Sequence, residues 1–282
     1  MQEGKFSKTA YGVAMRRAAH QLFDDPRILD DPLALQIVGE RAADALRAKP
    51  REAGNSVARA FRTFMAARSR YAEDQIAFAV RHGVDQCVIL GAGLDTFAYR
   101  NPHSALRVFE VDHPTTQAWK RERLRAASIP IPPSLTFVAI DFERQTLAAG
   151  LEQAGFKLNA PVLFSWLGVI PYLTREACLV TFSFVTKRPA GSGIVFDFAI
   201  HCDLLNLRQK LALYAVSKRV AAAGEPFQLF FDPTKLALEL NDMGFARTET
   251  LSGAQINARY FDHRADGLRV SGGLGQLMTA WV

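Results

Sequence analysis

Cysteine is scarce in this chain of 282 residues, and the three that occur, at positions 87, 178 and 202, form no C-x-x-C pair. Thiols so few and so widely spaced do not build the disulfide framework of a small secreted domain, and they suit a reducing compartment. The first twelve residues lack the apolar stretch of a secretory signal, and no run approaches the roughly 18 apolar residues of a membrane-spanning helix. These absences predict a cytoplasmic protein that does not enter a membrane.

Signatures of metal and nucleic-acid binding are missing as well. The six histidines show neither H-x-x-x-H nor H-x-x-E-H spacing, and no G-x-S-x-G elbow of an α/β-hydrolase occurs. The net charge of +6 comes from 34 basic and 28 acidic residues, and the densest basic run, 120–125, is interrupted by Glu122. No helix-turn-helix signal or aromatic interleaving accompanies the charge. We therefore expect a small-molecule substrate, no metal and no nucleic acid, while the oligomeric state stays open.

The chain does contain enough apolar residues for a large core, with 49% hydrophobic residues and 20 phenylalanines. Its first 85 residues have helical patterns. The segment 9–23 places apolar residues at helical spacing, and a second helix is expected from Pro32, capped by an aspartate before it. A third is expected over 56–82, where the looser periodicity predicts a break near 68–71.

From residue 86 onward, short β-rich runs alternate with helical segments. The candidate strands are 87–90, 106–111, 135–140, 162–166 and 194–200, with closing strands at 246–251 and 268–282. The candidate helices are 115–127, 146–154, 174–185, 203–223 and 233–243. This alternation predicts an α/β fold, a mostly parallel seven-stranded sheet with helices on both faces. Because no linker is evident, we expect residues 1–85 to form a helical cap on a domain of residues 86–282.

An apolar strand runs directly into a glycine-rich turn at 88–96, Val-Ile-Leu-Gly-Ala-Gly-Leu-Asp-Thr. Gly91, Ala92 and Gly93 would let a ligand approach the backbone at the carboxyl end of a strand, where open α/β sheets bind ligands. A dinucleotide site would have a third glycine where Thr96 stands, and Asp95 would repel a pyrophosphate. The same carboxylate suits the cationic S-adenosylmethionine. The turn therefore favours that cofactor over NAD, unless it is simply a tight turn without a ligand.

The next two strands end in acidic residues. Glu110 and Asp112 share one face of the second strand, and an acid at its end can accept hydrogen bonds from both hydroxyls of a ribose. After the third strand, Asp141 could accept from an adenine amino group while the ring packs against Phe142. Each acid alone could equally cap the following helix. Together, the three strand ends present their groups in the order that an adenosyl cofactor requires.

With these strand ends in place, the sequence resembles the class I S-adenosylmethionine-dependent methyltransferases of the leucine carboxyl methyltransferase-like group, including its large bacterial branch. The resemblance extends over nearly the whole chain. It rests on Thr9-Ala10, Arg17-Ala18, Asp31-Pro32-Leu-Ala34, Ala67-Arg-Ser-Arg-Tyr71, Leu90-Gly-Ala-Gly-Leu-Asp-Thr96, Phe109-Glu-Val-Asp-His-Pro114, Asp141-Phe142 and Leu167-Gly-Val-Ile-Pro-Tyr-Leu173. It implies a Rossmann-like class I methyltransferase fold with an N-terminal helical cap.

The resemblance also implies roles for single residues. Arg68 matches the cap arginine that pairs with the methionyl carboxylate of the cofactor, with Arg70 close by as the alternative. The other matched positions are Gly91 to Gly93 under the cofactor, Asp112 at the ribose, and Asp141 with Phe142 at the adenine.

One position departs from the family pattern. Leu167 stands where much of the family has a glutamate. If that glutamate holds the methionyl ammonium, this chain must use another acceptor, and backbone carbonyls around Ser165 and Trp166 are candidates. The departure bears on cofactor affinity and acceptor identity more than on the fold.

Few acid–base groups fall near the strand ends. Tyr172 and His201 are the candidate catalytic residues, with His113 a third possible base, although Asp203 beside His201 could simply cap a helix. A carboxylic acid is already ionised at neutral pH and needs no base, whereas a phenol or an alcohol gains from one. We therefore expect an S-adenosylmethionine-dependent O-methyltransferase that acts on a small-molecule carboxylate. The alternatives are a nicotinamide-dependent oxidoreductase and a non-catalytic protein that binds the same cofactor on this fold.

Overall fold

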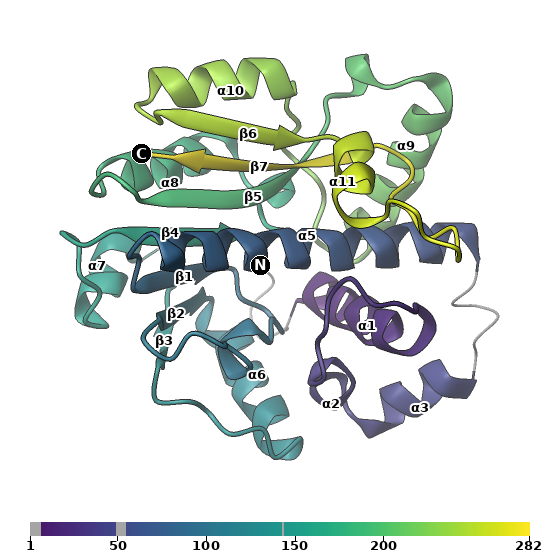
Figure 1. Ribbon diagram of the computed structural model, residues 1–282, viewed down its shortest axis with the longest axis horizontal. Coiled ribbons are helices and arrows are strands. Elements are labelled where there is room, and N and C mark those ends of the chain that lie inside the picture. The colour runs from purple at the N-terminus through teal and green to yellow at the C-terminus, as the bar shows by residue number, and fades with distance from the viewer. Residues whose placement is uncertain (1–6, 49–54, 143) are drawn as a thin grey trace.

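The computed structural model describes residues 7–48, 55–142 and 144–282. At its centre is a seven-stranded sheet with the strand order β3-β2-β1-β4-β5-β7-β6 (Figure 1). The strands are β1 (Gln86–Leu90), β2 (Arg107–Asp112), β3 (Leu135–Ala139), β4 (Val162–Trp166), β5 (Gly193–Ala199), β6 (Arg247–Leu251) and β7 (Gly275–Trp281). Strands β1 to β5 pair in parallel, and β7 runs antiparallel between β5 and β6. The predicted α/β fold with a mostly parallel sheet is therefore confirmed.

The helices before the sheet are α1 (Lys8–Phe23), α2 (Ala34–Val38), α3 (Glu40–Ala48) and α5 (Ser56–Arg81). Those that follow β1 are α6 (Pro114–Ala126), α7 (Leu147–Gln153), α8 (Arg175–Thr186), α9 (Leu207–Ala222), α10 (Pro233–Asp242) and α11 (Gly253–Tyr260). Short 3-10 turns are η1 (Phe97–Tyr99), η2 (Ile170–Tyr172) and η3 (Cys202–Leu204). Figure 1 shows α5 crossing the sheet, with α1, α2 and α3 gathered beyond one side of it.

The two faces of the sheet bury different cores because side chains alternate along each strand. On one face, Val88 and Leu90 of β1 belong to a cluster with residues of α7, α8 and α10. On the other face, Cys87 and Ile89 pack with Ile76 of α5. Both faces of the parallel strands are thus covered, as largely apolar strands require.

Helix α5 is continuous, so the break expected near residues 68–71 is wrong. Its N-terminal half packs against α1, whereas its later part lies on the strands, with Tyr71 and Ala72 in a cluster that includes Val195 of β5 and Leu277 of β7. Because α5 changes its packing partner along its length, the buried face of the helix points in a different direction in each half. The apolar residues therefore fit a single helical period only loosely. The boundary between cap and sheet domain at residue 85 stays a prediction, and α5 contributes to both.

Several expected boundaries shift. The second helix starts at Ala34 without a side-chain cap, because Asp31 is buried and accepts a hydrogen bond from Thr96 instead (2.7 Å). The helix expected from residue 203 starts at Leu207, where Asn206 forms a capping box. The closing strand expected over 268–282 covers only Gly275–Trp281, and α11 was not predicted. In the described ranges, no helix combines the length and apolarity needed to cross a membrane.

Candidate cofactor and acceptor site

A large cavity of about 2120 Å³ opens at the carboxyl ends of β1 to β5. The last residues of these strands and the segments that follow them line it at 91–95, 112–113, 140–142, 165–169 and 197–199. Helices α1 and α5 form one wall, and α8, α9 and the segment 223–228 contribute to the rest. A pocket for one drug-sized ligand typically has roughly 300–1,000 Å³, so the space is large enough for two molecules side by side.

The glycine-rich turn lies at the floor of this cavity. Gly91 and Gly93 have φ values of +64° and +47°, a left-handed conformation that L side chains rarely adopt. A Cβ on Gly91 would lie 2.4 Å from Val169 Cγ2, and one on Gly93 would lie 3.1 Å from the Cβ of Ala10 in α1. Glycine is therefore required at both positions, because the turn has a left-handed backbone there and because Val169 and α1 leave little room for a Cβ. Ala92, the third predicted residue, is buried and also lines the cavity.

The two acids predicted at the following strand ends both reach the cavity. The Asp112 carboxylate accepts hydrogen bonds from the backbone N–H groups of Gly93 (2.6 Å) and His113 (2.7 Å), and these two bonds orient it. Burial raises the pKa of Asp112, and these two N–H groups oppose that effect. Asp141 also lines the cavity beside Phe142, whose side chain is 63% exposed and so available to a planar ligand. Glu110 instead points into the interior, where it pairs with Lys120 (2.8 Å).

Asp95 lines the cavity but is already engaged with the protein. It accepts the N–H of Phe97 (2.8 Å) and lies 3.6 Å from the Arg17 guanidinium. Burial alone would raise the pKa of Asp95, yet Arg17, Lys120, the Phe97 N–H and Arg100 hold that pKa below its usual range. Asp95 therefore stays ionised and ties the glycine-rich turn to α1.

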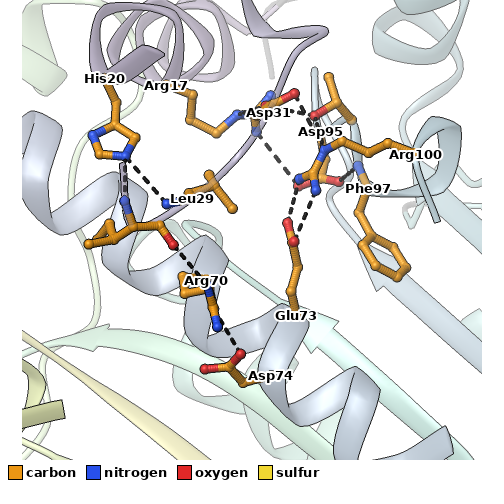
Figure 2. A network of polar contacts seen from close by, with 12 residues as sticks. Arg17, His20, Leu29, Asp31, Arg70, Glu73, Asp74, Asp95, Phe97 and Arg100 are labelled. Carbon is orange, nitrogen blue, oxygen red and sulfur yellow. Dashed lines mark hydrogen bonds and ion pairs between the residues drawn. The ribbon is translucent and has the colours of Figure 1, made fainter. Parts of the chain in front are cut away.

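Figure 2 shows how this tie continues into a wider network. Arg17 of α1 contacts the buried Asp31 (3.2 Å), which also lies 3.4 Å from Arg100, and Arg100 pairs in turn with Glu73 of α5. The network links α1, α5 and the segment after β1. It fixes the helical wall of the cavity relative to the sheet.

Arg68 and Arg70, the two arginines considered for one role, face different ways. Arg68 is 5% exposed and lines the cavity. The Arg70 guanidinium pairs with Asp74 (2.8 Å; Figure 2) and donates to the carbonyl of Ile28, and none of these three residues lines the cavity. Residues two apart on a helix point in nearly opposite directions, so the structure brings only Arg68 to the site.

Arg68 meets a residue that the sequence did not single out. Its Nη1 donates to Asp197 of β5 (2.9 Å), and the other carboxylate oxygen accepts the N–H of Gly168 (2.5 Å). Gly168 has φ +70°, and a Cβ there would lie 2.8 Å from Arg68 Nη2, so only glycine lets the guanidinium approach so closely. Leu167, the departure from the family pattern, packs on the cluster of α5 and β5. A lone acid inside the run Val-Phe-Asp-Phe was the signal for Asp197 in the sequence.

A further arginine of α1 also reaches the cavity. Arg16 lies over the ring of Phe61 (5.1 Å to the centroid) and donates to the carbonyl of Gly12 (2.8 Å). Among the described residues it forms no ion pair with a carboxylate. Burial lowers the pKa of Arg16, and the neighbouring Arg219 and Arg68 lower that pKa further. This part of the cavity is therefore electropositive.

The candidate acid–base groups are distributed unevenly. Tyr172 lines the cavity, and burial raises its pKa to about 12. Ser165, at the end of β4, also lines it. His113 is at the cavity too, but its Nδ1 accepts the N–H of Thr115 (3.3 Å) at the start of α6.

His201, expected beside the acceptor, does not line the cavity. Its exposed ring accepts the N–H of Asp203 (3.4 Å) in η3, so neither residue has the predicted position. The chain turns outward there because η3 separates β5 from α9. His201, Cys202 and Asp203 do bring a ring nitrogen, a thiol and a carboxylate within 4.8 Å of one another at this exposed turn.

The model of the leucine carboxyl methyltransferase family matches residues 10–186, more than half of the chain. A relative from Bacillus subtilis (strain 168), named "Putative S-adenosyl-L-methionine-dependent methyltransferase YktD", is 35% identical over 292 aligned residues, covering 95% of each chain. The chain belongs to the leucine carboxyl methyltransferase family. This membership confirms the resemblance and makes the protein a methyltransferase, so the nicotinamide-dependent alternative is wrong.

Other comparisons agree with this family and fold. A relative from Mycobacterium avium (strain 104), named as a methyltransferase of the same kind, is 32% identical over 205 residues, 67% of this chain and 63% of its own length. A solved "putative methyltransferase" from Thermobifida fusca YX matches with a TM-score of 0.58 at 15% identity, covering 99% of this chain and 96% of that one. Strand β5 and helix α9 lie beyond the segment that the family model matches. The Asp197 side of the site and the α9 wall therefore lie outside the segment that the family model matches.

Proposed function

We propose that this methyltransferase uses S-adenosylmethionine to methylate the carboxylate of a small, largely apolar molecule. The cofactor is the one in the names of its relatives. When bound, it supplies a methyl group on a positively charged sulfur. The substrate class, the transfer to oxygen and the residue roles below are the proposal.

The residues at the strand ends fit this cofactor. Asp112 is oriented to accept from the ribose hydroxyls, and Asp141 and Phe142 offer an acceptor and an apolar surface for adenine. Arg68 is buried, and its Nε has no hydrogen-bond partner among the described residues. Buried donors are rarely left unpaired, so the Arg68 guanidinium, which lines the cavity, has unused capacity for a ligand carboxylate. An adenosyl group carrying an amino acid satisfies all of these positions.

The observation that carries the acceptor class is the cation at Arg16. A guanidinium desolvated in this way, without a partner carboxylate in the described residues, is complementary to an anion. The walls around it are apolar, formed by Phe61, Phe64 and Met65 of α5 and by Val216 and Val220 of α9. An apolar body with a carboxylate matches both features.

The acid–base groups support the same class. The raised pKa of Tyr172 keeps its phenol protonated at neutral pH, so it donates hydrogen bonds and does not act as a base. His201 lies outside the cavity lining. A carboxylate needs no base, and most of the rate then comes from aligning its oxygen with the methyl group in a water-excluded site.

A methyl-transfer assay with paired acceptors tests the proposal. We expect wild-type protein and S-adenosylmethionine to methylate members of a panel of apolar carboxylic acids and not the matching alcohols. Mild alkali should release methanol from the product, because esters hydrolyse and ethers do not. Arg16→Gln should raise KM for the acid about tenfold or more, whereas Arg16→Lys should retain part of the affinity because it keeps the charge.

The pH dependence separates the two acceptor classes. At saturating acid, the rate should stay nearly flat between about pH 6 and 9, and His201→Ala should keep most activity. Transfer to the alcohols, a rate that rises through a pKa near ~6.5, or a ~10²-fold loss in His201→Ala would contradict a carboxylate acceptor.

A further inference from the structure

Asp197 and Arg68 form an ion pair whose two members both retain unused hydrogen-bonding capacity. Each is at most 6% exposed, and both line the cavity. The carboxylate accepts one hydrogen bond on each oxygen, from Arg68 and from the Gly168 N–H, although a carboxylate has about four acceptor positions. On Arg68, the buried Nε has no partner among the described residues. An unpaired donor and unused acceptor positions therefore belong to one buried ion pair at the cavity.

A ligand that fits this pair carries both charges itself. The α-amino acid group has an ammonium and a carboxylate on one carbon, so it can place its anion on the guanidinium and its cation on the carboxylate at the same time. Because the pair is neutral overall, a ligand with only one charge would leave a net charge buried at the site, and such burial is costly. The geometry thus favours a zwitterion over a simple anion.

We propose that Asp197 binds the methionyl ammonium of the cofactor while Arg68 binds the methionyl carboxylate. This assignment rests on the proposed function. It replaces the expectation that backbone carbonyls near Ser165 and Trp166 hold the ammonium, and it explains how the chain functions with an apolar Leu167. The acid comes from β5, one strand further along the sheet than the segment that carries Leu167.

The other described acids of the cavity are committed elsewhere. Asp95 is tied to Arg17 and the Phe97 N–H, and Glu239 pairs with Arg175 (2.5 Å). Glu225 accepts the N–H of Thr9 (3.3 Å) in α1. Asp197 is the acid that lies against the cavity arginine of α5.

Binding measurements with four adenosyl ligands test the assignment by calorimetry. The ligands are S-adenosylhomocysteine, its analogue without the amino group, its analogue without the carboxyl group, and 5′-methylthioadenosine, which lacks both. The protein is the full chain, wild type and Asp197→Asn. The substitution keeps the side-chain volume and an oxygen for the Gly168 N–H but removes the charge.

Asp197→Asn should weaken S-adenosylhomocysteine about ten- to hundredfold, the range expected for a charge-assisted hydrogen bond. It should change the affinity for 5′-methylthioadenosine less than about threefold. The wild type should prefer S-adenosylhomocysteine over the analogue without the amino group, and Asp197→Asn should lose that preference. Arg68→Gln, the reciprocal control, should instead lose the preference against the analogue without the carboxyl group.

Each other result has a distinct meaning. An equal loss for all four ligands in Asp197→Asn, or an unchanged preference for the amino group, would overturn the assignment and leave the proposed function standing. Wild-type protein that bound none of the four would overturn the proposed function itself. If a single variant does not fold, the neutral pair Asp197→Asn/Arg68→Gln leaves no unpaired charge at this contact and should show neither preference.

Discussion

Replacing Gly168 with alanine perturbs the site through one added carbon. The Cβ would lie 2.8 Å from Nη2 and 2.9 Å from Nη1 of Arg68, so the guanidinium would have to move away from Asp197. Breaking this charge-assisted hydrogen bond costs about 1.5–3 kcal/mol, and the left-handed backbone adds about 1–2 kcal/mol for any L side chain. We expect the free energy of unfolding to fall by both contributions and the affinity for S-adenosylhomocysteine to fall about tenfold or more.

Gly191→Ala is the matched control. Gly191 has φ +87°, and a Cβ there would meet nothing within 4 Å, so this variant has the backbone strain without the contact to Arg68. Gly191 also lies outside the cavity lining, before the start of β5. Its affinity by calorimetry should match that of the wild type, with about 1–2 kcal/mol of stability lost in urea denaturation. Equal affinities for the two alanine variants would refute the reasoning that Gly168 places Arg68.

Two further predictions concern the strand ends and the interior. Asp112→Ala should weaken the binding of S-adenosylhomocysteine by about 1.5–3 kcal/mol, and Asp141→Ala should weaken it by less, since adenine also packs on apolar surface. Calorimetry that showed no loss of binding in either variant would contradict the strand-end site. Glu110→Gln leaves the Lys120 ammonium buried without its carboxylate and should lower the free energy of unfolding by about 3–5 kcal/mol at pH 8, whereas Glu110→Gln/Lys120→Met should recover most of it. Burial raises the pKa of Glu110 to about 7 against the attraction of Lys120, so the folded protein keeps a proton that the unfolded chain loses. The contribution of this site to stability should therefore decline as pH rises from about 4.5 to 7, and denaturation of the double variant should lack that slope.

Local patterns were sufficient for the sheet and for one half of the site. The strand 162–166 is observed as predicted, β1 and β3 differ from the prediction by one residue at one end, and β2 and β5 are shifted by one residue at both ends. The glycine-rich turn, Asp112 and Asp141 reach one cavity because the carboxyl ends of parallel strands meet at one edge of the sheet. Such residues are predictable because strand period and strand direction fix where they point. His201 does not follow this rule, because it lies at the start of a 3-10 turn after β5 and its side chain does not line the cavity.

The amino-acid sequence by itself determined the parallel strands, most of the helices, the strand-end motifs and the family, because each depends on residues close together in the chain. Only the tertiary structure decided between Arg68 and Arg70, since both lie on α5 and the packing of that helix sets which one faces the cavity. Only the tertiary structure, too, brought Asp197 to Arg68 across 129 residues of chain. The sheet supplies one partner and the helix packed on it supplies the other, so the pair exists only once α5 docks on the sheet.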